Sequence, residues 1–497
     1  MHLAWHDYRY YPYERALALR EVSALLGASS TRAVEGGIEL EFYSDATPAA
    51  QLTYFAGYVN GHGYISTIQS RLENDARSGK NRQATRYSVH GLHEYKGKFN
   101  PQIARAVLNI FDIQPSYRIL DPFCGSGTTL VECAHMGVRG YGVDLNPFAV
   151  YLANAKLLAL STPVAKLRET LQRVTAKLRS TKRWTTALKN DVRGAYLQSW
   201  FSPHMLHTIE IVADKINLVA EDLAPIFLSV ASNLLRNYSL QDPNDLRIRR
   251  RKSALPDTPF VDAFLFAAEQ LLQRLDSTQS VLGVTKRTGE AMLSDITAVH
   301  EKKFRYLFDA ALTSPPYAMA LPYIDTQRLS LVWLNLLTAD RVLGLESELI
   351  GSRELRGADR RETISRMQEN KASLPTAQAD FCIALQKALA RRDGFRRKAV
   401  PTLLYRYFAS MQQSFKSVRH VLKPEAPFAL IVGHNHTVLG GVRYDINTPA
   451  HLASIAESVG WKVEEVIELQ TYHRYGYHVN NSVGAETLLI LRNRRDG

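Results

Sequence analysis

The sequence has few cysteines and no long run of apolar residues. Its three cysteines, Cys124, Cys133 and Cys382, are too few and too widely spaced for a disulfide framework or a zinc site. No basic segment followed by an apolar one opens the chain, and no run approaches the roughly 20 apolar residues of a membrane-spanning helix. These absences argue against a secreted, disulfide-rich protein. They predict a soluble, cytoplasmic protein with no metal and no membrane partner.

Acidic residues are also in deficit. The 497-residue chain holds 61 lysines and arginines against 48 aspartates and glutamates, which gives a net charge of +13. An excess of this sign favours a polyanionic partner, with nucleic acid as the first candidate and an anionic membrane surface as the second. The composition, 45% hydrophobic and 22% charged, is that of a globular protein with two or three packed units.

Strand-like and helix-like segments alternate in two parts of the chain. Between Pro101 and residue 160 the pattern predicts a helix, a strand over 118–121, a glycine-rich turn, a helix, a strand over 140–144 and a helix. The next strand is expected only at 309–313, and the alternation returns after residue 420. Such alternation is typical of an α/β fold with a parallel sheet and crossover helices.

The long gap between these strands predicts an insertion. A simple crossover needs a few tens of residues at most, and the apolar residues within the gap recur at helical spacing. The N-terminal part combines one helical stretch with one strand or hairpin. The predicted units are an N-terminal extension over 1–88, a catalytic domain over 89–160 and 285–497, a helical insertion over 161–284, and a second mostly helical region over 318–417.

A glycine-rich turn follows the first predicted strand of the catalytic domain. It runs Asp121-Pro-Phe-Cys-Gly125-Ser-Gly127-Thr-Thr129, and the second strand ends at Asp144. Glycines here let the backbone approach a nucleoside cofactor, and Asp144 can accept hydrogen bonds from ribose hydroxyls. The Asp121 carboxylate would repel a pyrophosphate but can accept hydrogen bonds from a cationic amino acid. The turn therefore favours S-adenosylmethionine over a dinucleotide.

A second motif, Thr313-Ser314-Pro315-Pro316-Tyr317, follows the strand predicted at 309–313. Two prolines fix their own φ angles and lack N–H groups, so nearby carbonyl groups can act as acceptors in a pocket. An exocyclic amino group presents two donors that such a pocket can satisfy, and Tyr317 can stack on a base turned out of a duplex. The position of the motif at a strand end, after the cofactor turn, favours this function over a surface turn.

Both motifs resemble those of the amino-methyltransferases of DNA. The first is similar to their Asp-Pro-Phe-x-Gly-Ser-Gly-Thr-Thr cofactor motif, and the second to motif IV. Its Ser-Pro-Pro-Tyr form is typical of cytosine-N4 enzymes, and Asp-Pro-Pro-Tyr of adenine-N6 enzymes. The resemblance implies a Rossmann-like S-adenosylmethionine-dependent methyltransferase fold, with a mixed, mostly parallel sheet and helices on both faces. The Pro-Cys dipeptide that usually carries the nucleophile of C5-cytosine enzymes does not occur in the chain.

The resemblance also implies roles for individual residues. Ser314 Oγ and the Pro315 carbonyl accept the two amino hydrogens during direct methyl transfer, without a covalent intermediate or a metal. The expected catalytic residues are Ser314, Pro315, Pro316 and Tyr317. The segment Lys96-Gly-Lys-Phe99-Asn-Pro101 is similar to the motif that packs against the methionine end of the cofactor. Glu290 is expected near the adenine, with Asp295 as a competitor for that role.

These implications define the expected cofactor site. Its residues come from the loop before the first strand, the glycine-rich turn, the end of the second strand and the start of the catalytic loop. The expected cofactor-binding residues are Phe99, Asp121, Pro122, Phe123, Gly125, Ser126, Gly127, Thr128, Thr129, Asp144, Leu145, Glu290 and Thr313. The expected product of the cofactor is S-adenosyl-L-homocysteine.

Two basic regions are candidates for contact with double-stranded DNA. Residues 161–284 hold 17 basic and 12 acidic residues, and residues 341–420 hold 16 basic and 8 acidic residues. Either region can follow phosphates, and arginine side chains can also recognise guanine edges. The expected DNA-binding residues are Arg247, Arg249, Arg250, Arg251, Lys252, Arg396, Arg397 and Lys398.

The sequence thus predicts a site-specific DNA methyltransferase that acts on cytosine N4 by base flipping. The resemblance implies a restriction-modification, epigenetic or defence role near the nucleoid of a bacterium or archaeon. A cognate restriction endonuclease is a candidate partner, and the protein is expected to be a monomer or homodimer. Three alternatives stay open: an adenine-N6 DNA methyltransferase, an RNA amino-methyltransferase, and a DNA-binding subunit without activity. Retention of Asp121, Asp144 and Ser314 together argues against the last.

Overall fold

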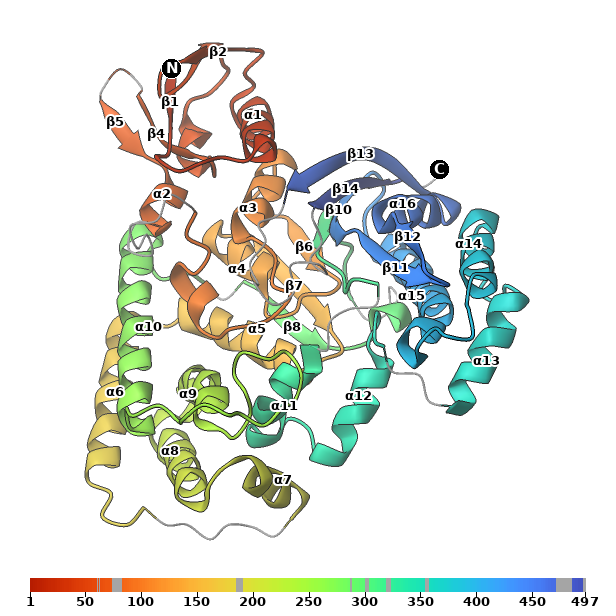
Figure 1. The fold of residues 1–497 in the computed structure, drawn as a ribbon. Coiled ribbons are helices and arrows are strands. Elements are labelled where there is room, and N and C mark those ends of the chain that lie inside the picture. The colour runs from red at the N-terminus through yellow and green to blue at the C-terminus, as the bar shows by residue number, and fades with distance from the viewer. Residues whose placement is uncertain are drawn as a thin grey trace.

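A seven-stranded sheet with the order β13-β14-β10-β9-β6-β7-β8 forms the centre of the molecule (Figure 1). The computed structural model describes residues 1–59, 61, 63–73, 83–184, 191–286, 288–299, 304–318, 323–353, 357–470 and 485–494. Neighbouring strands from β8 to β10 are parallel, and β14 is antiparallel to β10 and β13. The strands are β6 (Arg118–Asp121), β7 (Arg139–Asp144), β8 (Glu290–Leu293), β9 (Ala310–Thr313), β10 (Pro427–Gly433), β13 (Trp461–Gln470) and β14 (Ala485–Asn493).

Helices cover both faces of this sheet because successive strand residues point to opposite sides. In β10, Ala429 and Ile431 pack in one hydrophobic cluster, while Leu430 and Val432 pack in another. The helices that contribute to the first cluster are α1 (Pro12–Leu26), α3 (Pro101–Ile110) and α4 (Thr128–His135). Those of the second are α13 (Gly357–Gln368), α14 (Thr376–Lys387), α15 (Phe395–Val421) and α16 (Thr448–Ser458). The predicted mixed, mostly parallel sheet with helices on both faces is confirmed.

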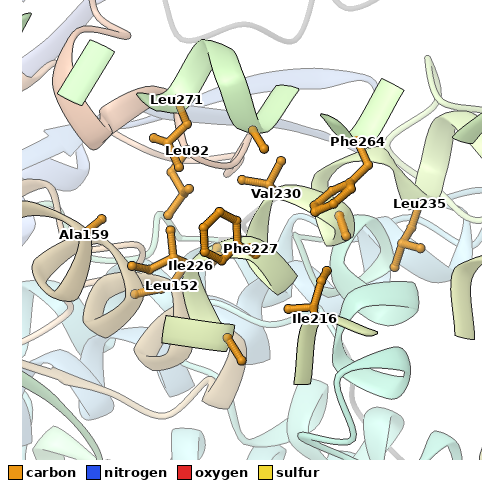
Figure 2. Close-up of a cluster of buried hydrophobic side chains, with 14 of the residues drawn as sticks. Leu92, Leu152, Ala159, Ile216, Ile226, Phe227, Val230, Leu235, Phe264 and Leu271 are labelled. Atoms are coloured by element: carbon orange, nitrogen blue, oxygen red, sulfur yellow. The ribbon is translucent and has the colours of Figure 1, made fainter. Parts of the chain in front are cut away.

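A third hydrophobic cluster joins the helices between β7 and β8 to the catalytic part. Figure 2 shows Leu152 of α5 beside Phe227 of α9, with Phe264 and Leu271 of α10 in the same cluster. The helices of this layer are α5 (Pro147–Leu160), α6 (Val164–Arg179), α7 (Val192–Trp200), α8 (Pro203–Ala220), α9 (Ala224–Tyr238), α10 (Phe260–Leu282), α11 (Tyr323–Trp333) and α12 (Val342–Glu348). The helix α11 follows the Thr313–Tyr317 motif in the chain, so this helical layer includes the helix next to that motif.

One stretch is longer and more apolar than the sequence suggests. By length and composition alone, residues 203–238 could cross a membrane, with a mean hydropathy of 1.5 in their most apolar window. However, 61% of that window is buried inside the protein, and α8 and α9 both contribute to the third hydrophobic cluster. The stretch is interrupted at Glu221, whose φ is 50°, so it forms two helices. These two helices are therefore core helices of the helical layer.

The first 73 residues contain more secondary structure than the one helix and one strand or hairpin that the sequence predicts. They form a second sheet, with the order β2-β3-β1-β4-β5, beside α1. Leu17 and Val22 of α1 pack in the same cluster as Ile431 of the central sheet. The N-terminal part therefore covers one face of that sheet. Its strands and second helix are β1 (His2–Trp5), β2 (Ser30–Val34), β3 (Gly37–Phe42), β4 (Phe55–Val59), β5 (Tyr64–Ser66) and α2 (Ile68–Glu73).

One feature contradicts the prediction from sequence, and a second was not predicted. The expectation of no strand between residues 144 and 309 is wrong, because β8 pairs with β7 at the edge of the sheet. The strand has only four residues, of which only Ala291 is buried, so its apolar run is too short to predict a strand. The second feature is a hairpin of β11 (Asn435–Leu439) and β12 (Val442–Ile446), which continues from the end of β10.

Candidate active site

A cleft of about 190 Å³ opens where β6, β7 and β9 end at the same edge of the sheet. This is the edge at which open α/β sheets bind ligands. Both sequence motifs reach it, although 185 residues separate Thr128 from Thr313 in the chain. The lining residues are Tyr95, Lys96, Gly97, Lys98, Phe99, Phe123, Cys124, Gly125, Ser126, Thr128, Asp144, Ser314, Pro315, Pro316, Tyr317 and Glu486.

The glycine-rich turn is held by hydrogen bonds from two directions. Asp144, at the end of β7, accepts a hydrogen bond from the Gly125 N–H at 2.8 Å. The buried ammonium of Lys156 on α5 donates to the carbonyl and hydroxyl oxygens of Ser126, at 2.7 and 3.0 Å. Gly127 has a φ of 83°, and a Cβ there would lie 2.8 Å from the Cβ of Ala153. The turn therefore packs tightly against α5, and Gly127 has no room for a side chain.

Asp121 and Thr313 form a buried pair beneath the cleft. Thr313 Oγ1 donates to Asp121 Oδ1 at 2.6 Å, and the Phe123 N–H donates to the same oxygen at 3.2 Å. The second oxygen, Oδ2, has no hydrogen-bond partner among the described residues. Burial raises the pKa of the Asp121 carboxyl to about 6. This pair joins the cofactor turn to the first residue of the catalytic motif.

The Thr313–Tyr317 loop, the candidate catalytic loop, is anchored on β10 and β14. Ser314 Oγ donates its hydrogen to the Ile431 carbonyl at 3.0 Å, which leaves the lone pairs of Oγ as acceptors. The Tyr317 hydroxyl donates to the Glu486 carboxylate, and both side chains line the cleft. The loop therefore presents a hydroxyl acceptor and an aromatic ring to the same space.

Several expected cofactor residues support the turn without lining the cleft. Pro122, Gly127 and Thr129 are buried behind it, and Leu145 packs against the helical layer. Glu290 is the first residue of β8 and pairs with Tyr141, whereas Leu293 pairs with Asp144. The placement of Glu290 near the adenine therefore needs correction, because this residue lies at the opposite end of the strand. Its competitor Asp295 follows the carboxyl end of β8 but does not line the cleft either.

Most arginines of the first predicted basic cluster, residues 247–252, contact groups in their own neighbourhood. Arg250 lies over the Trp200 ring at 5.3 Å and donates to the Ser199 carbonyl at 3.0 Å. Arg251 donates to the Asn237 and Ser239 carbonyls, at 2.6 and 3.0 Å. Arg249 pairs with Asp245 at 3.1 Å, while Arg247 and Lys252 are exposed. Most of this cluster therefore holds its own loop against the helical layer.

The second predicted basic cluster lies on the first turn of α15. Arg396 and Arg397 are exposed there, and Lys398 Nζ donates to the Arg391 carbonyl at 2.9 Å. Cations on the first turn of a helix oppose its macrodipole, so this arrangement favours an anionic partner. The Arg392 guanidinium donates to the Gly440 carbonyl at the tip of the β11–β12 hairpin, at 3.1 Å.

The cleft contains residues that sequence analysis did not predict. Tyr95, Lys96 and Lys98 lie beside Phe99, within or next to the segment already quoted, so the motif could have found them. Glu486 carries no local signal, because it follows Tyr317 by 169 residues and belongs to an ordinary strand sequence. Only the pairing of β14 with β10 brings it to the site.

Comparisons with known proteins agree with this architecture. Residues 92–198 match a family model described as "RMKL-like, methyltransferase domain". The chain is 25% identical over 379 residues to the type II methyltransferase M.MvaI of Kocuria varians, covering 71% of this chain and 78% of that protein. The protein has the fold of an S-adenosylmethionine-dependent methyltransferase.

Two shorter matches cover parts of this methyltransferase fold. Over 107 residues the chain is 41% identical to the type II methyltransferase M.MjaII of Methanocaldococcus jannaschii, covering 21% of this chain and 18% of that protein. Over 52 residues it is 44% identical to the tRNA (guanine(10)-N2)-dimethyltransferase of Methanothermobacter thermautotrophicus, covering 10% of this chain and 16% of that protein. These matches support S-adenosylmethionine-dependent methyl transfer as the activity.

The residues of the cleft fit this cofactor. Asp121 lies beneath the cleft and does not line it, but its buried Oδ2 has no hydrogen-bond partner among the described residues and could accept one from the amino group. Asp144 lines the cleft and keeps lone pairs for ribose hydroxyls. Gly125 has a φ of 48° and lets the backbone face the cleft without a side chain. The site would therefore hold the amino acid end near β6 and the nucleoside near β7.

Cofactor affinity is expected to fall below pH 6. Burial raises the pKa of the Asp121 and Asp144 carboxyls to about 6, and a protonated Asp121 loses its attraction for an ammonium group. One pH unit below that value only about a tenth of the carboxyl is ionised, so affinity at pH 5 should be about tenfold weaker than at pH 7.5. Calorimetric titration at the two pH values measures this change.

Lower pH should weaken cofactor binding but raise the free energy of unfolding of the cofactor-free protein, through the same two carboxyls. Their folded-state pKa lies above the unfolded value of about 3.9, so the cofactor-free protein gains stability as pH falls from 6 towards 4. The Asp121→Asn variant should bind the cofactor weakly at pH 7.5 and show a smaller pH dependence. Equal affinity of the natural protein at pH 5 and pH 7.5 would contradict this account.

Proposed function

We propose that the protein is a DNA methyltransferase that transfers a methyl group from S-adenosylmethionine to the exocyclic N4 of cytosine. The observation that carries this proposal is the hydrogen bond from Ser314 Oγ to the Ile431 carbonyl at 3.0 Å. Because the hydroxyl hydrogen is already donated, Oγ faces the cleft as an acceptor, which suits an amino group with two donors. The relatives named type II methyltransferases support DNA as the substrate.

The residues of the chain act on the target nitrogen rather than on the methyl group. The lone pair of a cytosine amino nitrogen is delocalised into the ring and must be localised before it can attack. Ser314 Oγ and the Pro315 carbonyl accept the two N–H hydrogens, and Tyr317 stacks on the flipped base. The bound cofactor supplies an electrophilic methyl group on a sulfonium sulfur. Positioning and charge placement then supply most of the rate enhancement.

Methylation at cytosine C5 does not fit the one thiol that lines the cleft. Burial raises the pKa of the Cys124 thiol well above its ordinary value, which keeps it protonated. The Cys124 side chain also packs tightly against Gly142. A Cβ added at Gly142 would lie 2.6 Å from the Cys124 Cβ. A C5 enzyme needs a thiolate nucleophile at the base, so an amino nitrogen is the better acceptor for this cleft.

The experiment that tests the proposal identifies the methylated nucleoside. The protein is incubated with labelled S-adenosylmethionine and either plasmid DNA or total RNA, and the polymers are digested for mass spectrometry. We expect label in N4-methyldeoxycytidine from DNA. Label in N6-methyldeoxyadenosine would overturn the choice of cytosine and show that the target is adenine N6, the target of enzymes with an Asp-Pro-Pro-Tyr motif. Label in RNA alone, or in neither polymer, would overturn it.

We place the main phosphate-binding surface at the start of α15 rather than in the 247–252 cluster. Arg249, Arg250 and Arg251 each have a local hydrogen-bond or ion-pair partner, although the first two are exposed. Arg396 and Arg397 are exposed on a helix turn that favours anions. The five residues of β11 extend about 16 Å from the catalytic loop towards this turn. Asn435 Nδ2, at the near end of β11, donates to the Ala318 carbonyl. Duplex DNA could therefore contact both places at once.

Replacing Arg396 and Arg397 by alanine should lower the affinity for DNA. It should also make that affinity less sensitive to salt concentration. Each lost phosphate contact lowers the slope of log affinity against log salt by about 0.9, so the double variant should lose nearly two units. Fluorescence anisotropy with a duplex between 50 and 200 mM salt measures the slope. A variant with Lys416→Ala and Lys462→Ala removes the same net charge from other exposed positions and is the control. Equal losses in both variants would contradict the assignment.

A further inference from the structure

The side chain of Tyr317 is confined at three points. Its hydroxyl donates to the Glu486 carboxylate. A Cβ added at Gly433 would lie 2.8 Å from Tyr317 Cε2, so the ring edge fits only against a glycine. A Cβ added at Gly351 would lie 2.5 Å from the Tyr317 carbonyl oxygen, so the backbone is confined as well. Hydroxyl, ring edge and backbone are each held by a different residue.

Two of these contacts come from one pair of strands. Gly433 on β10 stands directly opposite Glu486 on β14 in the antiparallel ladder. The glycine leaves space for the ring, and the carboxylate beside it receives the hydroxyl. The reversed strand β14 therefore contributes directly to the cleft, in addition to extending the sheet.

A ring held in this way is oriented before a base arrives. A tyrosine side chain otherwise distributes among several rotamers, and fixing one of them removes that disorder from the reacting complex. Stacking also sets the plane of the base, and this plane determines whether the amino hydrogens point at Ser314 Oγ. An ionised carboxylate cannot donate to the ring nitrogen N3 of cytosine, and the two amino hydrogens are assigned to Ser314 Oγ and the Pro315 carbonyl. The contact of Glu486 with the Tyr317 hydroxyl is therefore the one that the geometry supports.

We infer that Glu486 is a positioning residue that orients the Tyr317 ring for stacking on the target base. The inference rests on the proposed function, because it assumes a flipped base in the cleft. It assigns a role to a residue outside both sequence motifs. Gly433 is the second member of this arrangement, since any side chain at its position would displace the ring.

A double-mutant cycle tests the inference. Glu486→Leu and Tyr317→Phe each remove the hydrogen bond and should each lower kcat about 5- to 10-fold, with KM for DNA within about twofold. The double variant should be no slower than the slower single variant, because both changes remove one interaction. Glu486→Gln should recover kcat to within about twofold of the natural protein, since its amide oxygen can accept the same hydrogen bond.

Controls separate positioning from folding. S-adenosylmethionine affinity and the melting temperature should not change in these variants. Glu468→Leu alters an exposed glutamate on the neighbouring strand β13 and should leave kcat unchanged. Gly433→Ala should reproduce the loss of kcat by pushing on the ring. Multiplicative losses in the cycle, or a Glu486→Gln variant as slow as Glu486→Leu, would overturn the inference.

Failure of the proposed function gives a different result. The cycle is run on whichever nucleic acid the natural protein methylates, DNA or RNA. An active natural protein with uncoupled Glu486 and Tyr317 overturns only the positioning role. A natural protein that methylates neither polymer overturns the proposed function and this inference together.

Discussion

Ser314→Ala is expected to lower kcat for methyl transfer by about 10²- to 10³-fold and to change S-adenosylmethionine affinity less than about threefold. The hydroxyl donates to the Ile431 carbonyl and so offers only acceptor lone pairs to the target nitrogen. Its removal leaves one amino hydrogen without a partner at the moment when the nitrogen becomes tetrahedral. The cofactor turn is untouched, because its hydrogen bonds come from Asp144 and Lys156.

A control separates this catalytic effect from the loss of an ordinary hydrogen bond. Ser161 Oγ also donates to a backbone carbonyl, that of Leu158 at 3.2 Å, but lies at the end of α5 and does not line the cleft. Ser161→Ala should therefore leave kcat unchanged. Single-turnover rates and calorimetric cofactor titrations measure the two quantities. Parallel loss of rate and cofactor affinity in Ser314→Ala would mean that the hydroxyl supports the pocket rather than the transfer.

Gly127→Ala is expected to weaken S-adenosylmethionine binding more than tenfold and to lower the free energy of unfolding by about 2–5 kcal/mol. The residue has a φ of 83°, which disfavours any side chain. A new Cβ would also lie 2.8 Å from the Cβ of Ala153 on α5. Because the turn cannot move towards the helix, it must shift into the cleft that holds the cofactor.

Two further variants separate backbone strain from the clash. Gly137 has a similar φ of 70° but no heavy atom within 4 Å of an added Cβ. Gly137→Ala should therefore lower the free energy of unfolding by only about 1–2 kcal/mol and leave cofactor affinity unchanged. Adding Ala153→Gly to Gly127→Ala should restore part of the affinity by making room. Chemical denaturation and calorimetry measure these effects. Equal losses at Gly127 and Gly137 would contradict the packing argument.

Local sequence patterns predicted most of the catalytic core well. The strand expected over 118–121 is β6, and the glycine-rich turn leads into α4 at Thr128, as expected. These predictions succeeded because apolar residues at strand spacing, followed by glycines, restrict the backbone within a few residues. Asp144 and Ser314 also reach one cleft, because parallel strands place their carboxyl ends at a common edge, and Phe99 joins them from the loop before α3.

Predictions based on charge or on weak strands were less successful. The DNA contact expected of Arg250 and Arg251 stays a prediction, although both donate to carbonyl groups of their own neighbourhood. Charge counting cannot show this, since it records how many cations a segment has and not which carbonyls surround them. The strand β8 was missed because its apolar run of three residues is too short to be told from a loop. The expectation for Glu290 came from the resemblance alone, and the register of β8 against β7 puts this residue at the other end of the strand.

The sequence by itself determined the class of fold and placed the glycine-rich turn and the Thr313–Tyr317 loop at strand ends, because each depends on residues close together in the chain. The tertiary structure alone decided what surrounds Tyr317. Glu486 and Gly433 are separated in the chain from that tyrosine and from each other, and they meet it only because β14 runs antiparallel beside β10. The register of two strands is set by burial across the whole sheet, and local sequence does not encode it.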